Sequence, residues 1–147
     1  MACLQQFQKL LDNHKEEMIA ALQADFNKPA FETLVTEISM LQKELTYFKN
    51  NLKTWMHPKR VFPSILNFPS KETVAYQPYG VVLVISPWNY PLLLALQPLI
   101  AALAAGNCVV LKPSELAPNT SALLAKLIGK YFSYEYIQVI EGGVEET

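Results

Sequence analysis

Apolar positions at helical spacing dominate the first third of the chain. Residues 4–26 carry two apolar groups separated by Asp12 and Asn13, which favours two short amphipathic helices with a potential cap between them. From Phe31 onward, apolar residues at positions 31, 34, 35, 38, 41, 45 and 48 predict a long surface helix. We place the opposite, solvent-facing side of this helix at Glu32, Glu37, Lys43 and Lys49.

A proline-containing segment follows and interrupts the helical pattern. Pro58, Pro63 and Pro69 prevent the helix from continuing through residues 56–72, so an extended arm is expected there. Residues 73–77 are predicted to form a short strand before a turn at positions 78–80. We therefore divide the chain into helices over 1–55, an arm over 56–79 that is a possible oligomerisation element, and a sheet domain over 80–147.

The last part of the chain alternates strand and helix signals. Residues 81–85 are all apolar, which predicts a central strand covered on both faces. A helix over 91–105 would have Pro91 in its first turn, while Pro98 requires a kink or a late start. A second strand is expected at 108–111, then a helix capped by Asn119 or Thr120 and running to about residue 132, and a third strand at 136–140.

This β-α-β-α-β order predicts an α/β fold, a partial doubly wound (Rossmann-like) parallel sheet preceded by a helical region and a strand arm. Right-handed crossovers would place both helices on one face and leave the other face of strand 81–85 bare. Either the N-terminal helices cover that face or further elements belong there. The chain also ends at Thr147 without the helix that should follow, so we expect it to be truncated.

The distribution of charge leaves one alternative to weigh. No charged residue lies between Thr73 and Leu111, a gap long enough for a transmembrane helix. Prolines at 87, 91 and 98 and several polar residues divide this stretch, so a buried α/β core is favoured. Twelve Lys and Arg residues against 13 Asp and Glu residues give a net charge of −1, which argues against a nucleic-acid partner.

The cysteine and histidine residues bear on the cellular location and on metal binding. Cys3 and Cys108 are the two cysteines, and the N-terminus lacks the apolar segment of a secretory signal, so a reducing, cytoplasmic location with Met1 as the start is expected. His14 and His57 are isolated from other ligand-type residues, and we predict no metal site.

Three sequence blocks carry a family resemblance. Residues 78–91 read PYGVVLVISPWNYP, and residues 97–98, 101–107 and 109–115 read QP, AALAAGN and VVLKPSE, with a Gly-Gly pair at 142–143. These blocks, in this order and spacing, resemble the aldehyde dehydrogenase family and are most similar to its class 3 branch. The resemblance extends over nearly the whole chain from about Leu4.

The resemblance implies roles for residues that follow the first two strands. It implies that Asn89 donates its side-chain N–H to the oxyanion formed from an aldehyde, and that Lys112 and Glu115 hold the adenosine ribose of NAD or NADP. It further implies that Ser86, Pro87 and Trp88 shape the nicotinamide end and that Tyr90 lines the aldehyde tunnel.

Each of these roles has a structural alternative. On spacing alone Asn89 could cap the helix that starts at Pro91, and Lys112 with Glu115 could be a solvated pair at a strand end. Trp88 and Tyr90 could be core aromatics.

The resemblance also shows which parts this sequence does not supply. Its 147 residues contain no G-Q-x-C, E-L-G-G or G-S-x-x-x-G block, and neither cysteine has the surroundings of a nucleophile. We therefore expect a full-length parent to oxidise aldehydes with NAD or NADP as a homodimer built through the arm, and this chain alone to be inactive. The alternative is a non-catalytic fragment that acts as an interaction or self-association module, and an acyl-phosphate or acyl-CoA reductase is a weaker third possibility.

Overall fold

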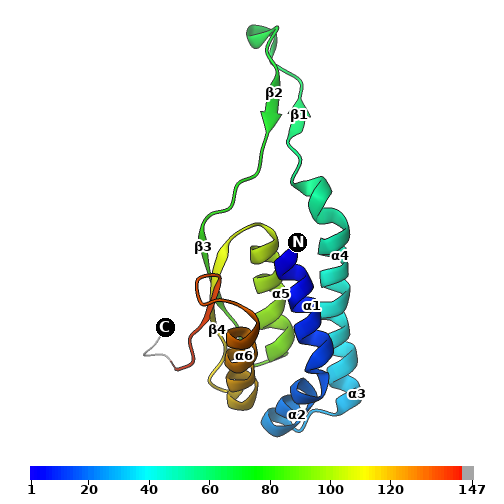
Figure 1. The fold of residues 1–147 in the computed structure, drawn as a ribbon, viewed down its shortest axis with the longest axis vertical. Coiled ribbons are helices and arrows are strands. Elements are labelled where there is room, and N and C mark those ends of the chain that lie inside the picture. The colour runs from blue at the N-terminus through cyan, green and yellow to red at the C-terminus, as the bar shows by residue number, and fades with distance from the viewer. Residues whose placement is uncertain (144–147) are drawn as a thin grey trace.

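The computed structural model describes residues 1–143 and contains an N-terminal helical region, a projecting arm and a parallel sheet (Figure 1). The fold class predicted from the sequence is confirmed. The helical elements are α1 (Ala2–Asn13), α2 (Lys15–Phe26), α3 (Ala30–Thr33), the π-helical turn η1 (Leu34–Ile38), α4 (Ser39–Trp55), the short 3₁₀ turn η2 (Ile65–Asn67), α5 (Pro91–Ala104) and α6 (Pro118–Tyr131). The strands are β1 (Lys59–Val61), β2 (Glu72–Val74), β3 (Val81–Ile85), β4 (Cys108–Lys112) and β5 (Ile137–Val139).

The main sheet is parallel and has the order β3-β4-β5. Val81 pairs with Cys108 and Ile85 with Lys112, so β3 and β4 end side by side at the carboxyl end of the sheet. Within the described residues β4 is the central strand and β3 lies at the sheet border. Our assignment of residues 81–85 to the central strand is therefore wrong here, because a continuous apolar run reports burial potential and not strand order.

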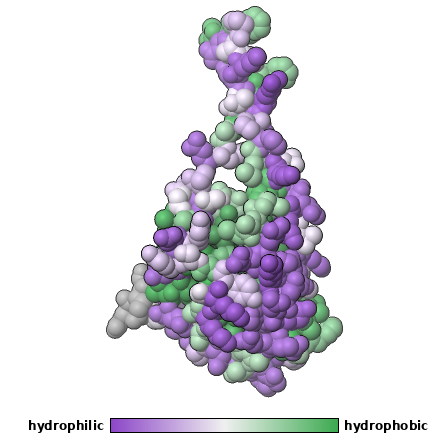
Figure 2. All heavy atoms as spheres, viewed as in Figure 1, coloured by the Kyte–Doolittle hydropathy of each residue, from purple (hydrophilic) through white to green (hydrophobic). Residues whose placement is uncertain are grey.

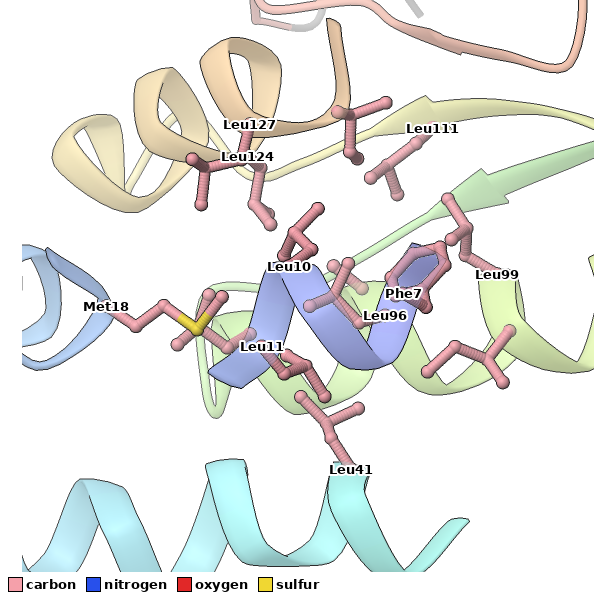
Figure 3. Packing of buried hydrophobic residues seen from close by; sticks show 14 of the residues in the cluster. Phe7, Leu10, Leu11, Met18, Leu41, Leu96, Leu99, Leu111, Leu124 and Leu127 are labelled. Carbon is pink, nitrogen blue, oxygen red and sulfur yellow. The ribbon is translucent and has the colours of Figure 1, made fainter. Parts of the chain in front are cut away.

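Helices cover one face of this sheet. Phe7 and Leu10 of α1 lie among side chains from α5, α6 and β4, as Figure 3 shows, whereas Leu11 points toward Leu41 of α4. All three α1 side chains are fully buried. The crossover helices thus pack on the same face, as right-handed connections require. The N-terminal helices pack onto these crossover helices and do not cover the other face of the sheet.

The outer face of the sheet is exposed in the described chain. Val81, Leu83 and Ile85 are 69%, 60% and 55% exposed, whereas Val84 between them points into the core. In Figure 2 hydrophobic atoms gather on the side of the molecule where the sheet lies, and hydrophilic atoms dominate the helical side. Strand β3 is therefore covered on one face within residues 1–143, and the expectation that both faces are covered is wrong for this part of the chain. The N-terminal helices, one of the two possible covers considered above, do not lie on the exposed face.

The long helix differs from its predicted orientation at one turn. The π-helical turn η1 inserts an extra residue between α3 and α4, which rotates the faces of the two segments relative to each other. Phe31 before the turn and Val35 within it are exposed, while Ile38 at its end and Leu41 after it are buried. Glu37, predicted to face solvent, is instead fully buried.

The arm is an antiparallel hairpin that projects from the body (Figure 1). Lys59 pairs with Val74 and Val61 with Glu72, which agrees with the extended arm expected from the prolines. At the tip, the side chains of Phe62, Ile65 and Leu66 are almost entirely exposed. The arm leaves the body beside the amino end of β3. No helix in residues 1–143 combines the length and apolar character needed to cross a bilayer.

Candidate functional site

Two connecting segments meet at the carboxyl end of the sheet. The backbone N–H of Ser86 donates a hydrogen bond to the carbonyl oxygen of Lys112 (3.0 Å), directly beyond the paired residues of β3 and β4. The loop 86–90 after β3 and the turn 113–117 after β4 therefore start side by side. In doubly wound sheets, ligands bind outside the carboxyl ends of the strands, which is where these two segments begin.

Ser86 carries a hydroxyl group without a partner. Its side chain is buried, and its Oγ accepts and donates no hydrogen bond within the described part of the chain. Buried polar atoms nearly always have a hydrogen-bond partner, so an unpaired one at a sheet edge needs an explanation. A ligand group bound at this edge would provide one.

Trp88, Asn89 and Tyr90 line an open cleft of about 280 Å³ whose other wall is formed by residues 26–29. The ring of Trp88 lies 6.4 Å from that of Phe26, measured between centroids. Trp88 and Tyr90 are 53% and 44% exposed, so they are not core aromatics. The cleft joins the loop after β3 to the segment that follows α2.

Tyr90 marks an unusual point in the backbone. Its φ of 50° lies in the left-handed region, which residues other than glycine adopt rarely. The Nζ of Lys28 lies 4.5 Å from the centroid of its ring, a cation–π contact across the cleft. Pro91 then starts α5 with a fixed φ and no N–H to satisfy.

The first free N–H groups of α5 are capped from another helix. The backbone N–H groups of Leu92 and Leu93 donate to Oε2 of Glu37 at 2.9 and 3.0 Å. Oε1 of the same carboxylate accepts a hydrogen bond from Lys28 at 2.6 Å. Sequence reasoning missed this arrangement because Glu37 was placed on the solvent side.

This cap tests one of the two interpretations of Asn89, that its side chain caps α5. The N-cap residue of α5 is Tyr90, its side chain does not cap the helix, and the open N–H groups bind Glu37. Asn89 is exposed in the cleft, and its side chain forms no hydrogen bond with the residues that the structure describes. The helix-cap alternative for Asn89 is therefore wrong.

Lys112 and Glu115 form an ion pair beyond the end of β4. The Nζ of Lys112 lies 3.2 Å from Oε2 of Glu115, and Lys112 is buried while the Glu115 side chain is nearly half exposed. A hydrogen bond from its own backbone N–H, followed by the one from Lys112, holds the pKa of Glu115 below its ordinary value. Since Lys112 is buried, the pair is not a fully solvated one. It offers an acceptor and a donor next to Ser86.

The second crossover helix is capped in a similar way by Asp25 of α2. Its Oδ1 accepts hydrogen bonds from the backbone N–H and the side-chain amide of Asn119, and its Oδ2 from the backbone N–H and hydroxyl of Thr120. Asn119 and Thr120 therefore lie inside the first turn of α6 and are not its cap, which corrects the sequence prediction. Burial acts to raise the pKa of Asp25, but these four hydrogen bonds together lower it.

Neither cysteine lies at this edge. Cys108 begins β4 at the opposite, amino end of the sheet, and Cys3 lies in the first turn of α1. Among residues 1–143, no group of three or more His, Cys, Asp or Glu side chains is placed to hold a metal ion.

Comparison with known proteins gives consistent matches. The sequence model described as "Aldehyde dehydrogenase family" matches residues 1–147. The chain is 48% identical over 145 residues to aldehyde dehydrogenase family 3 member H1 of Arabidopsis thaliana, covering 97% of this chain and 30% of that protein. It is 42% identical over 146 residues to human aldehyde dehydrogenase family 3 member B1, covering 99% of this chain and 31% of that protein.

A solved structure shows the same fold. The substrate-bound state of Staphylococcus aureus AldH superimposes with a TM-score of 0.95 at 40% identity, covering 97% of this chain and 31% of that one. The chain thus spans about 30% of the length of the curated relatives that it matches.

Proposed function

Since this chain belongs to the aldehyde dehydrogenase family, we propose that a full-length protein containing it oxidises aldehydes to carboxylic acids with NAD⁺ or NADP⁺. The observation that carries the proposal is the free amide of Asn89. It lies in the cleft at the carboxyl end of the sheet, and Glu37 takes the capping role that would otherwise occupy it. Within this chain Asn89 is the residue proposed to touch the reacting carbonyl.

The role of Asn89 follows from the chemistry of carbonyl addition. Attack on an aldehyde places negative charge on the carbonyl oxygen, and a fixed N–H donor stabilises that charge in the transition state. Such a donor typically contributes about 3 kcal/mol to lowering the barrier. The amide of Asn89 is a neutral donor that has no other partner among residues 1–143, which suits this task. Tyr90, in the same cleft, is proposed to line the path of the aldehyde.

The cofactor is proposed to bind along the carboxyl edge of the sheet. Lys112 and Glu115 would bind its adenosine ribose, and Ser86, Pro87 and Trp88 would border its nicotinamide end. The unpaired buried hydroxyl of Ser86 and the partly exposed Glu115 carboxylate fit a ligand rich in hydroxyl and amide groups. When bound, the nicotinamide supplies the hydride acceptor. Glu115 would repel a 2′-phosphate and Lys112 would attract it, so the proposal includes both cofactors.

The remaining chemistry requires residues that this sequence does not contain. A thiolate nucleophile and a base that activates water belong to blocks absent from these 147 residues. We therefore propose that the isolated chain does not turn over aldehyde. Residues 1–55 and 80–147 would form the helical and cofactor parts in the cytoplasm, and the arm within 56–79 would build a homodimer.

A second candidate function rests on the exposed outer face of the sheet. Val81, Leu83 and Ile85 form a row of exposed apolar side chains, which favours an interaction or self-association module. The reading frame beyond Thr147 distinguishes the two candidates. Continuation into G-S-x-x-x-G, E-L-G-G and G-Q-x-C blocks supports oxidation; a stop codon, together with a sedimenting oligomer of the isolated chain, supports the module.

The direct test uses the Asn89→Ala variant of a full-length protein that contains this chain. We expect kcat for aldehyde oxidation to fall by about 100- to 1,000-fold, because one oxyanion donor is lost. The KM for the cofactor should change little, since Asn89 is proposed to contact the aldehyde. A variant that retains the parent kcat would overturn the proposed role.

A further inference from the structure

We propose that Glu37 is a positioning residue that fixes the direction of the Asn89 amide, an inference that rests on the function proposed above. Glu37 lies on the turn η1, far from Asn89 in sequence, and it does not line the cleft. Its contacts nevertheless hold the backbone on the carboxyl side of Asn89 through two independent connections. One runs through the start of α5, and the other through Lys28.

The first connection fixes where α5 begins. A single oxygen of Glu37 accepts the N–H groups of Leu92 and Leu93, and Pro91 before them has no N–H. The positive end of the helix dipole also favours a carboxylate at this place. The first turn of α5 is therefore anchored to η1 only three and four residues after Asn89.

The second connection reaches the residue next to Asn89. Lys28 donates to the other oxygen of Glu37, and its Nζ also lies over the ring of Tyr90. Tyr90 holds a left-handed backbone conformation that needs support from its surroundings. Because Lys28 contacts both groups, the Glu37 carboxylate sets the position of the ammonium group that rests on Tyr90.

The burial of Glu37 shows that this arrangement is specific. Its residue is 0% exposed, and the Lys28 side chain is 11% exposed. A buried charged group is tolerated where its partners satisfy it, and both oxygens of Glu37 are satisfied. The π-helical turn brings Glu37 inward, and such turns occur frequently at functional sites. The buried ion pair of Glu37 and Lys28 therefore contacts both Tyr90 and the first turn of α5, the segments that directly follow Asn89.

The isosteric change Glu37→Gln breaks this arrangement in a defined way. The glutamine oxygen can still accept the N–H groups of Leu92 and Leu93, but its amide NH₂ then faces the ammonium group of Lys28. Two donors meet, so Lys28 loses its partner and its place over Tyr90. Helix α5 keeps its cap, whereas the support of the loop is lost.

The test is a double-mutant cycle in a full-length protein that contains this chain. Glu37→Gln should lower kcat by about 10- to 100-fold, because a small displacement of a catalytic group is costly, and should leave the KM for NAD⁺ or NADP⁺ within about twofold. Combined with Asn89→Ala it should cause no further loss, since the group that it positions is already gone. Losses that multiply, or an unchanged kcat in Glu37→Gln, would overturn the proposal.

Asp25→Asn is the matched control. It weakens a carboxylate cap on the other crossover helix, α6, without touching the loop 86–90. Its kcat at saturating cofactor should equal that of the parent. An equal loss of kcat in this variant would assign the effect of Glu37→Gln to general destabilisation and overturn the positioning role.

A second measurement separates this inference from the proposed function. In a Trp55→Phe background, Trp88 reports on the loop through its fluorescence, and amide hydrogen exchange reports on the first turn of α5. Glu37→Gln and Lys28→Met should shift the Trp88 emission, whereas Asp25→Asn should not. If Asn89→Ala retains activity, the proposed function fails, and the emission data still decide whether Glu37 holds the loop. Unchanged emission in Lys28→Met overturns the proposal even if Glu37→Gln does not fold.

Discussion

The two crossover helices begin in the same way but are held by different caps. Both α5 and α6 have proline in their first turn and an N-cap residue, Tyr90 or Ala117, that does not cap through its side chain. In each case a carboxylate from the N-terminal helical region supplies the missing acceptor. Glu37 does so from complete burial with a lysine partner, whereas Asp25 is partly exposed and has only neutral partners among residues 1–143.

This difference separates stability from positioning. Four hydrogen bonds join Asp25 to the first turn of α6, and they connect α2 to α6. Glu37 makes two bonds to α5 and one to Lys28, and the latter extends to the loop that forms the cleft. A carboxylate with neutral partners holds only the helix that it caps, whereas a carboxylate paired with a lysine also holds the loop that precedes the helix.

The largest expected effect comes from removing the buried cap. Glu37→Ala leaves Lys28 without its partner and two backbone N–H groups unsatisfied in a buried site. We expect the free energy of unfolding to fall by about 3 to 5 kcal/mol, the range for breaking a buried ion pair. Urea denaturation followed by circular dichroism measures it. A loss below about 1 kcal/mol would mean that the two caps are equivalent, contrary to the comparison.

A smaller effect is expected for the partly exposed cap, Asp25. Asp25→Ala should lower the free energy of unfolding by about 1 to 2 kcal/mol, as for the loss of other helix caps. The same denaturation experiment applies, with Asp12→Ala as a control because, among residues 1–143, Asp12 accepts hydrogen bonds only from the side chains of Gln8 and Gln42. If Asp25→Ala costs as much as Glu37→Ala, burial is not what distinguishes the two sites.

The smallest effect concerns an exposed carboxylate that also joins α2 to α6. A hydrogen bond from Lys126, followed by one from His14, lowers the pKa of Glu17 from 4.5 to about 2. Since the pKa is lower in the folded state, Glu17 contributes stability above pH 4.5 that is lost as the pH falls toward 2. Glu17→Gln should therefore be slightly less stable near neutral pH and should lose less stability on acidification.

Thermal unfolding at several pH values between about 6 and 2.5 measures this contribution. The difference between the parent and Glu17→Gln should shrink steadily as the pH falls. A difference that stays constant with pH would show that Glu17 acts through packing and not through its charge.

The strands of the sheet domain are easier to predict from the sequence than the contacts made by the N-terminal helices. Residues 81–85 and 108–112 are recognisable because apolar runs, glycine turns and strand-end polar residues are local signals. The positions of Ser86, Lys112 and Asn89 near the carboxyl edge follow from the same signals. Strand order does not, since it depends on pairing between distant segments, and residues 81–85 were placed at the centre for that reason.

The two distant caps could not be read from periodicity. The spacing of an uninterrupted α-helix puts Glu37 on the solvent side, but the π-helical turn shifts the register by one residue. Asp25 lies far along the chain from the helix that it caps. The local signal is indirect: Tyr90 and Ala117 precede prolines but are not residues that cap a helix through their side chains, so the acceptor comes from elsewhere.

The hairpin arm joins the body at the amino end of β3 (Figure 1). The cleft lined by Asn89 lies beside the loop that follows the carboxyl end of β3. Attachment of the protein to a sensor chip or resin through an engineered cysteine at the hairpin tip would hold it by the end remote from that cleft. Small molecules in the flowing buffer would then have an unobstructed approach to the cleft.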